Sequence, residues 1–223
     1  MGTLGQPGHT YVDNGMHQLH HAGRVFACDR DIEALAQWQD CVLLLSSDTD
    51  CLSLWDRDGL IRTARTGVYP QDMAVTGDMV CVCGGADSML HLLSLPALQT
   101  LASHRLPGMP ERVALQSGSA YVLTLLAEEA VCTALLRLDL LTGEAKALMQ
   151  LPGLPGAITA ADDGLWLGVS EQVLHLPYDH AEPDILIDGF GLARLIEVEP
   201  EGVIVTDELE DRIVFIRSPA AGT

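Results

Sequence analysis

Positive charge is scarce in this sequence. Its 223 residues include 12 lysines and arginines against 31 aspartates and glutamates, so the formal net charge is −19. Lys146 is the only lysine. Phosphate backbones and anionic membrane surfaces are bound through clusters of basic side chains. The composition therefore argues against nucleic acids and membranes as partners, and it favours basic proteins or divalent cations.

Aromatic residues and long apolar runs are also lacking. Aromatics make up 4% of the chain, which disfavours stacking platforms for sugars or single-stranded nucleic acid. No apolar run approaches the roughly 20 residues that a transmembrane helix needs. Residues 1–9 carry neither the basic region nor the apolar region of a secretory signal. We therefore expect a cytoplasmic protein.

Six cysteines are present, and none belongs to a Cys-x-x-Cys pair. Most of them fall within apolar β-type patterns, where a thiol packs as a small hydrophobic group. Without an export signal, we expect them to be reduced and structural. Cys81 and Cys83 share one face of a predicted strand and have no basic neighbour in sequence, so no reactive thiolate is predicted.

What the sequence does contain is a repeat of about 40 residues. Short β-type runs alternate with turn signals along the chain, and no long segment shows a helical period. Five turn signals each separate a first strand from a more apolar second strand, and their second residues are 40, 78, 118, 164 and 202. A four-stranded propeller blade has about this length. The predicted first strands are Ile32–Trp38, Asp72–Thr76, Arg112–Gln116, Ala157–Ala161 and Leu192–Val198.

These units predict an all-β fold, a β-propeller of five four-stranded blades in a single domain over residues 8–218. The fifth unit lacks a fourth strand, so we expect an N-terminal strand, within 10–12 or 17–21, to complete it and close the ring. The alternative is a propeller of six blades, one of them partial. Residues 1–7 and 219–223 are predicted to be flexible termini.

Three signatures of the units resemble a known repeat. A glycine precedes a proline just before three of the first strands, as in Gly67–Pro70. Ala120–Thr124 (Ala-Tyr-Val-Leu-Thr) and Val203–Asp207 (Val-Ile-Val-Thr-Asp) are similar to a second strand that reads Tyr-Val-Thr-Asn. Leu54–Asp56 and Leu138–Asp139 are similar to a third strand that ends in Asp. The chain thus resembles the YVTN-type β-propeller repeat of bacterial proteins, which shares much with NHL and WD-type repeats. The resemblance implies a propeller that binds partners at one face, and it implies no particular reaction.

One face of such a propeller is predicted to be acidic. In a blade of four antiparallel strands, the loop before the first strand and the loop between the second and third strands emerge on the same face. The carboxylates in and beside these loops are the candidate binding residues: Asp31, Asp48, Asp50, Asp72, Asp87, Glu111, Glu128, Glu171 and Asp207. The plainer interpretation is that Asp is common in exposed turns, and the opposite face carries aspartates as well.

We expect a non-enzymatic binding or scaffold protein whose loops on this face bind a protein or a small ligand. A ring of carboxylates could instead hold Ca²⁺ or Mg²⁺ and serve a metal-dependent hydrolase of lactones or esters. His17, His20 and His21 form a further candidate metal cluster, although a strand would turn His20 away from the other two. No P-loop, nucleophile elbow or zinc-protease motif is present, so no catalytic residue is assigned.

Overall fold

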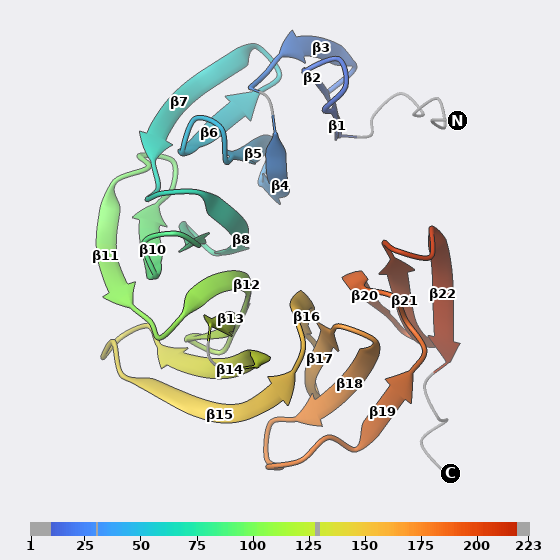
Figure 1. Cartoon of the computed structure of the whole chain (residues 1–223). Coiled ribbons are helices and arrows are strands. Elements are labelled where there is room, and N and C mark those ends of the chain that lie inside the picture. The colour runs from blue at the N-terminus through green and yellow to red at the C-terminus, as the bar shows by residue number, and fades with distance from the viewer. Residues whose placement is uncertain (1–9, 30, 128–129, 218–223) are drawn as a thin grey trace. The chain divides into compact units, whose positions relative to one another are not determined.

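The computed structural model describes residues 10–29, 31–127 and 130–217. All regular elements in these ranges are β-strands, 22 in number, which form six antiparallel sheets (Figure 1). Across the described ranges there is no helix long and apolar enough to cross a membrane. The all-β prediction is therefore confirmed.

Four of the sheets have four strands each, and strands that are consecutive in sequence pair with one another. The first two of these sheets contain β4 (Ile32–Trp38), β5 (Cys41–Ser46), β6 (Cys51–Asp56) and β7 (Gly59–Arg65), then β8 (Pro70–Thr76), β9 (Met79–Gly84), β10 (Met89–Ser94) and β11 (Thr100–Arg105). The next two contain β12 (Met109–Gln116), β13 (Ser119–Ala127), β14 (Val131–Asp139) and β15 (Ala145–Pro152), then β16 (Pro155–Ala160), β17 (Gly164–Val169), β18 (Gln172–Pro177) and β19 (Ile185–Asp188).

The remaining two sheets have three strands each. One holds β1 (Tyr11–Asp13), β2 (Gln18–His21) and β3 (Arg24–Ala27), and the other holds β20 (Ala193–Glu199), β21 (Gly202–Asp207) and β22 (Arg212–Arg217). All five predicted turn signals lie at the junction of a first and a second strand, as expected. Three predicted first strands begin earlier than expected, at Pro70, Met109 and Pro155. Glu111 therefore lies inside a strand rather than before it, and Asp72 lies within its strand rather than at its start.

The described residues form six sheets, whereas five blades were predicted and six, one of them partial, were the alternative. The N-terminal segment does not supply a single strand to the last sheet but forms a sheet of its own, because two turns divide it. Asp13 accepts a hydrogen bond from the backbone N–H of Met16 (3.0 Å) in the first turn, and Ala22 and Gly23 form the second with positive φ angles. Leu19 then becomes fully buried against the neighbouring β4–β7 sheet.

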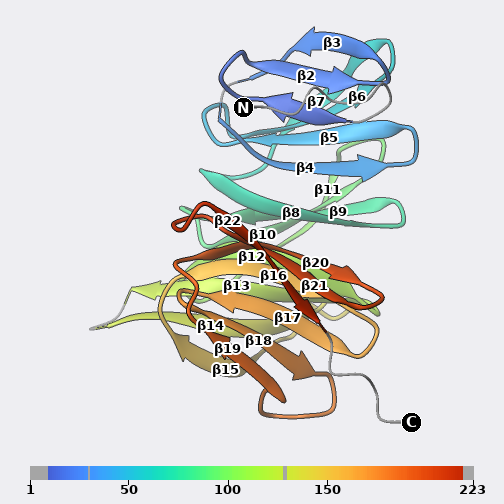
Figure 2. The ribbon, with the colours of Figure 1, turned by 90° about the vertical axis from the view of Figure 1, so that its right-hand side faces the viewer.

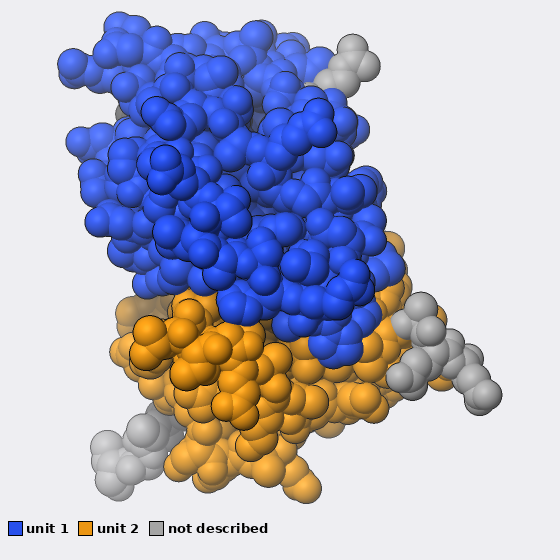
Figure 3. All heavy atoms as spheres, turned by 90° about the vertical axis from the view of Figure 1, so that its left-hand side faces the viewer, with its two compact units in different colours: residues 1–111 blue, residues 112–223 orange. Residues whose placement is uncertain are grey.

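The chain divides into two compact units, residues 1–111 and 112–223 (Figure 3). Unit 1 contains the sheets from β1 to β11, and unit 2 contains β12 from Arg112 onward and every later strand. Each unit is described by itself below. The prediction of a single domain over 8–218 stays a prediction, and the predicted flexible termini lie outside the described residues.

Within each unit the hydrophobic core lies between adjacent sheets. One cluster joins the β4–β7 and β8–β11 sheets in unit 1, and another joins the β16–β19 and β20–β22 sheets in unit 2. The first strands of these pairs lie side by side, β4 next to β8 and β16 next to β20 (Figures 1 and 2). The indole N–H of Trp38 reinforces the first pair by donating to the Gly77 carbonyl (2.9 Å). Packing of this kind fixes the loops at the ends of each sheet.

Candidate functional site

Two loops meet at one edge of four of the sheets, and they form the candidate site. We call the loop before the first strand the leading loop and the loop between the second and third strands the central loop. In four sheets a backbone N–H of the central loop donates to a carbonyl of the leading loop 16 residues earlier: Ser47 to Asp31 (3.2 Å), Gly85 to Tyr69 (3.2 Å), Ser170 to Leu154 (2.8 Å) and Glu208 to Leu192 (2.9 Å). The two loops therefore share an edge in these sheets, as the chain direction predicts.

Some of the predicted carboxylates hold these loops in place. The Asp50 carboxylate accepts a hydrogen bond from the backbone N–H of Tyr69 (2.8 Å). The Asp87 carboxylate accepts from the backbone N–H groups of Val68 (3.2 Å) and Met89 (3.1 Å). Both side chains are half-buried. These two aspartates satisfy backbone donors of loops that lack a strand partner.

Asp207 is the most enclosed of the predicted carboxylates, with 1% of its surface exposed. It accepts hydrogen bonds from the backbone N–H groups of Gly191 and Leu192 and from the Arg212 guanidinium, all at 3.0 Å. Burial by itself would raise the pKa of this carboxyl, but the backbone and Arg212 hydrogen bonds outweigh it and hold the pKa below its usual value. Asp207 therefore works as an ionised clamp on the leading loop of its sheet.

The other predicted residues are spread over different surroundings. Asp72 lies in β8 opposite Cys83, and Glu111 lies in β12; both are half-buried and engaged in polar interactions. Glu171 is exposed, and its backbone carbonyl accepts from the N–H groups of Gly189 and Phe190 (3.1 Å each). Glu128 lies outside the described residues.

Asp31 and Asp48 are the two predicted residues that the structure brings together around one hollow. This hollow measures about 410 Å³ and lies at the loop edge of the β4–β7 sheet, where Glu33 and Tyr69 also line it. We call it the acidic hollow. Both aspartates are exposed. Three carboxylates around one opening produce a negative potential that attracts a cationic group.

Neighbouring polar groups hold the walls of the acidic hollow. The Asn14 side chain both donates to the Ile32 carbonyl (3.2 Å) and accepts from the Ile32 N–H (3.3 Å). The Ser47 hydroxyl donates to the Glu33 carboxylate (2.7 Å), and the Ser46 hydroxyl donates to Asp48. Neutral donors thus position Glu33 and Asp48, and none of the three carboxylates has a cation partner among the residues that the structure describes.

Glu33 is a lining residue that sequence reasoning misses. The ladder between β4 and β5 shifts register between Ile32 and Ala34, so Glu33 is the extra residue of a β-bulge. The same shift recurs at the start of the first strand in three other sheets, where Gln71, Gly156 and Arg194 occupy the bulge. Bulges re-aim side chains at the edges of sheets. The alternation of Asp31 and Glu33 is the sequence signal that could have revealed the pair.

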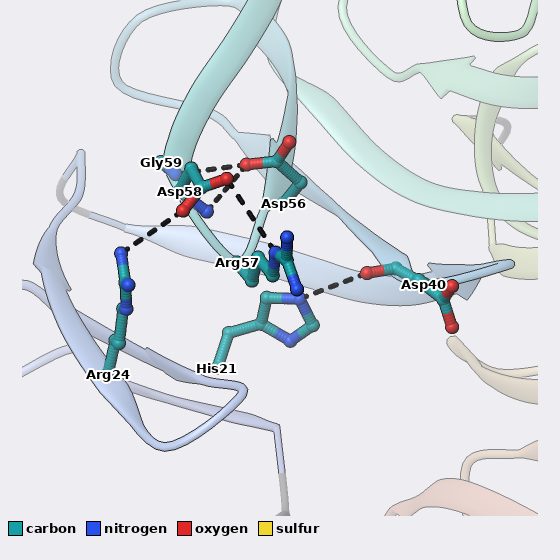
Figure 4. Close-up of polar contacts among 7 residues, drawn as sticks. All are labelled: His21, Arg24, Asp40, Asp56, Arg57, Asp58 and Gly59. Atoms are coloured by element: carbon teal, nitrogen blue, oxygen red, sulfur yellow. Dashed lines mark hydrogen bonds and ion pairs between the residues drawn. The ribbon is translucent and has the colours of Figure 1, made fainter.

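A second hollow in unit 1 lies at the opposite edge of the β4–β7 sheet, near the turn at Asp40 (Figure 4). Its volume is about 840 Å³, and His21 and Cys41 line it. His21 is buried and bonds to the Asp40 carbonyl through Nε2 (3.2 Å) and to the Thr10 hydroxyl through Nδ1 (2.9 Å). Because a carbonyl only accepts, Nε2 carries a proton. The ring thereby ties the N-terminal sheet to the turn of the next sheet.

The charged groups around this second hollow are committed to a turn. The Asp56 carboxylate accepts from the backbone N–H groups of Asp58 (2.7 Å) and Gly59 (3.0 Å), and Asp58 pairs with Arg24 (3.3 Å) (Figure 4). Burial, and then the charges of Asp56 and Asp40, raise the pKa of the Cys41 thiol. The thiol is therefore kept protonated, which argues against a nucleophile here.

In unit 2, the aspartate at the end of a third strand also forms a turn, as Asp56 does in unit 1. Asp139 ends β14 and accepts from the backbone N–H groups of Leu141 (3.0 Å) and Thr142 (2.8 Å). The bonds from Thr142 are the main reason that the pKa of this carboxyl lies below its usual value. The Asp at the end of the third strand is therefore a turn-forming residue at both positions.

The described residues contain no group of three or more His, Cys, Asp or Glu side chains that could hold a metal ion. The histidine cluster separates, because the His20 ring stacks on Tyr11 (4.3 Å between centroids) while His21 is turned inward. All six cysteines are free thiols, and burial raises the pKa of Cys81 to about 12, with a smaller contribution from Asp72. The alternative of a metal-dependent hydrolase gains no support from this arrangement.

A Ser–His–Asp line in unit 1 also escapes sequence reasoning. His91 Nδ1 lies 3.0 Å from the Ser103 hydroxyl on β11, and His91 Nε2 lies 3.4 Å from the Asp87 carboxylate. A Cβ added to Gly67 or Gly84 would fall about 2.5 Å from that carboxylate, at 2.5 and 2.4 Å respectively. The backbone at these two glycines thus packs closely against the Asp87 carboxylate that contacts His91. The three side chains connect β10 with β11 and with the central loop of the same sheet.

No family model matches the chain, and no curated protein matches it either. Solved structures do. The WD40 β-propeller domain of Doa1 is 13% identical with a TM-score of 0.73, and the match covers 89% of this chain and 67% of that one. A chain of the nidogen/laminin complex is 12% identical with a TM-score of 0.69 over 83% of this chain and 75% of that one. The RRP9 WD40 repeats are 11% identical with a TM-score of 0.66 over 78% of this chain and 57% of that one.

These similarities establish the fold. At 11–13% identity they identify a β-propeller repeat fold, and two of the three neighbours carry WD40 repeats. The chain spans between 57% and 75% of the length of these neighbours. The narrower resemblance to the YVTN-type repeat stays a prediction.

Proposed function

We propose that this protein is a non-catalytic scaffold that binds a basic segment of a partner protein at the acidic hollow of unit 1. The observation that carries the proposal is the convergence of Asp31, Glu33 and Asp48 on one opening of about 410 Å³. The likeness to WD40 propellers supports a role in protein interaction. The net charge of −19 supports a basic partner over an acidic one.

The chemistry of the hollow suits an arginine or lysine side chain. Like charges around one opening repel, and an incoming guanidinium or ammonium group relieves that repulsion. Charge-assisted hydrogen bonds to carboxylates are about twice as strong as neutral ones. The Tyr69 ring, half of whose surface is exposed, offers an apolar flank for the aliphatic stem of the side chain.

The six sheets are proposed to serve as six blades of one propeller, the first and last of them three-stranded. Support comes from the six-sheet topology and from propeller neighbours whose matches extend over 78–89% of the chain. Within each unit, the leading and central loops of neighbouring blades would contribute to a binding face.

Fluorescence anisotropy with labelled hexapeptides tests the function. The probes are an Arg- and Lys-rich peptide and a Glu-rich peptide of equal length, and the protein is compared with the triple variant Asp31→Asn, Glu33→Gln, Asp48→Asn. We expect the basic peptide to bind the unaltered protein and to lose at least about tenfold in affinity with the variant, because charged hydrogen bonds of this kind are worth about 1.5–3 kcal/mol each.

A matched control separates the hollow from the overall charge. The variant Asp78→Asn, Asp162→Asn, Glu201→Gln removes the same three charges from exposed turns at the other edge of the sheets. It should bind the basic peptide as the unaltered protein does. Equal losses in both variants would show that only net charge attracts the peptide, and the acidic hollow would then not be the site.

A further inference from the structure

A hollow in unit 2 has the opposite character to the acidic hollow. Its volume is about 310 Å³, and it lies between the β12–β15 and β16–β19 sheets. Tyr121 on β13, Arg137 on β14 and Lys146 on β15 are paired directly across the three strands, so they form one row along its wall. The only lysine of the chain is thus placed beside an arginine. We call this site the cationic hollow.

Neither cation of the row forms a close ion pair with a carboxylate, although the charge of Arg137 does act on Asp139 at the end of the same strand. The Arg137 Nε donates to the Ser119 hydroxyl (3.0 Å), which leaves its terminal nitrogens for other acceptors. Within the described ranges no carboxylate lies within 4.0 Å of either cationic group. Like charges directly opposite on neighbouring strands are destabilising. Such a pair in a chain with an excess of acids calls for a ligand that neutralises it.

The remaining walls of the cationic hollow are apolar and aromatic. Leu165 and Leu176 contribute from the next sheet, and the rings of Tyr121 and Tyr178 pack 5.7 Å apart. The Tyr178 hydroxyl donates to the Ala161 carbonyl (2.9 Å), and burial, followed by the neighbouring Tyr121, raises its pKa to about 12. The phenol therefore stays neutral and adds no negative charge.

One carboxylate does line the opening. Asp179 has 86% of its side chain exposed, and its oxygen lies 3.9 Å from the His180 ring. This carboxylate points into solvent and pairs with the imidazole rather than with either cation of the row. The net character of the inner wall remains cationic.

We propose that the cationic hollow binds a small organic oxyanion, a carboxylate or phosphate monoester carried on a flat apolar body. The planar fork of Arg137 matches the two oxygens of such a group, and Lys146 supplies a second charge beside it. The tyrosine and leucine wall receives the apolar body. A volume of about 310 Å³ lies at the lower end of the range for small-molecule sites. This inference concerns a different unit and the opposite charge, so it stands or falls independently of the basic-peptide site.

Isothermal titration calorimetry of the full chain tests the inference with four probes: phenyl phosphate, benzoate, inorganic phosphate and phenyltrimethylammonium. We expect phenyl phosphate or benzoate to bind, inorganic phosphate to bind at least about tenfold more weakly because it lacks the apolar body, and the cation not to bind. Tighter binding of phenyl phosphate identifies a phosphate ligand, and tighter binding of benzoate identifies a carboxylate. Inorganic phosphate binding as tightly as phenyl phosphate would overturn the proposal of an organic ligand.

Substitutions of Arg137 and Lys146 test whether the ligand binds at this row. Arg137→Gln and Lys146→Gln should each weaken binding about tenfold, and the double variant should abolish it. Lys146→Arg retains the charge and should stay within about threefold of the unaltered protein. Arg105→Gln removes an exposed arginine from β11 in unit 1 and should change nothing. Equal binding by the double variant and by Arg105→Gln, or no binding of either organic anion at 10 mM, would overturn the assignment.

A measurement of thermal stability shows whether a variant that no longer binds is still folded. Removal of one of two opposed like charges should leave the melting midpoint unchanged or raise it at low salt, because repulsion is relieved. A folded double variant that no longer binds phenyl phosphate supports the proposal. A folded double variant that binds it fully contradicts the proposal.

Discussion

The loop edges of the β4–β7 and β20–β22 sheets contain the same residue types in opposite roles. Both edges have the backbone bond between central and leading loops, from Ser47 to Asp31 in one and from Glu208 to Leu192 in the other. At the first edge Asp48 is exposed beside an open hollow. At the second edge Asp207 is 1% exposed and accepts hydrogen bonds from three residues.

The difference follows from which group accepts the hydrogen bonds of the backbone N–H groups in the leading loop. In the β4–β7 sheet the Ile32 N–H bonds to the Asn14 side chain, so no carboxylate has to turn inward. In the β20–β22 sheet the N–H groups of Gly191 and Leu192 have Asp207 as their acceptor. An aspartate at this edge is therefore structural where it completes the leading loop, and it is available for binding where another residue does so.

The largest effect is expected from Asp207→Ala. The substitution leaves the N–H groups of Gly191 and Leu192 without their acceptor and removes the partner of Arg212. We expect the melting midpoint to fall by several degrees, measured by circular dichroism or calorimetry. The comparison variant Asp48→Ala should lower it by no more than about a third as much, since an exposed side chain is involved. A smaller fall for Asp207→Ala than for Asp48→Ala would reverse the roles assigned to the two edges.

The sequence predicts much of this fold because turns and apolar second strands are local signals. The turn signals at 40, 78 and 118 lie between the first two strands of a sheet, and those at 164 and 202 mark the first residue of the second strand. The sequence leaves the N-terminal segment open between a single closing strand and a partial sixth blade, because its strands have only three or four residues, too few to show a period. The existence of a separate N-terminal sheet depends on the burial of Leu19 against a neighbouring sheet, which is a tertiary contact.

The candidate site is predictable only in part. The sequence identifies Asp31 and Asp48 from the direction of the strands. It does not distinguish them from Asp207, because the burial of Asp207 depends on a loop 15 to 16 residues away. Glu33 lies at a shift of register, and its alternation with Asp31 is the one sequence signal for its place in the site. The cationic hollow depends on the pairing of Arg137 with Lys146, which a repeat pattern alone does not align.

Acid should weaken the clamp at Asp207 selectively. The pKa of this carboxyl is lower in the folded protein than its ordinary value of 3.8, so the unfolded chain binds the proton first as pH falls. The stabilisation is complete above pH 3.8 and is lost as the pH falls through the folded pKa. Chemical denaturation of the protein and of Asp207→Asn between pH 6 and pH 2 measures this. The variant should lose less stability over that range, and parallel curves for the two proteins would contradict the clamp.

A smaller effect is expected from Ser170→Ala. The Ser170 hydroxyl accepts the backbone N–H of Leu154 (2.7 Å) and so does for the β16–β19 sheet what Asp207 does for the last one. Because one neutral hydrogen bond is lost, the free energy of unfolding should decrease by about 0.5–1.5 kcal/mol in urea denaturation. Ser170→Asn retains a side-chain acceptor in a residue that tolerates the positive φ of this position, and it is the matched control. A loss as large as that of Asp207→Ala would show that the charge of Asp207 adds nothing to its role.

The smallest effect on stability is expected from Asp31→Asn, the conservative change at the acidic hollow. Asp31 has a φ of 47°, and asparagine is among the residues that tolerate this left-handed conformation best, so the backbone should not change. We expect the free energy of unfolding to stay within about 0.5 kcal/mol of the unaltered value, because an exposed carboxylate is replaced. Binding of the basic hexapeptide should nevertheless weaken, and the difference should shrink at high salt as the charges are screened. If the carboxylates at this edge are available for binding, their substitution should lower the affinity for the peptide and leave the free energy of unfolding almost unchanged. A joint loss of both would place Asp31 with Asp207 among the structural residues and remove the contrast between the two edges.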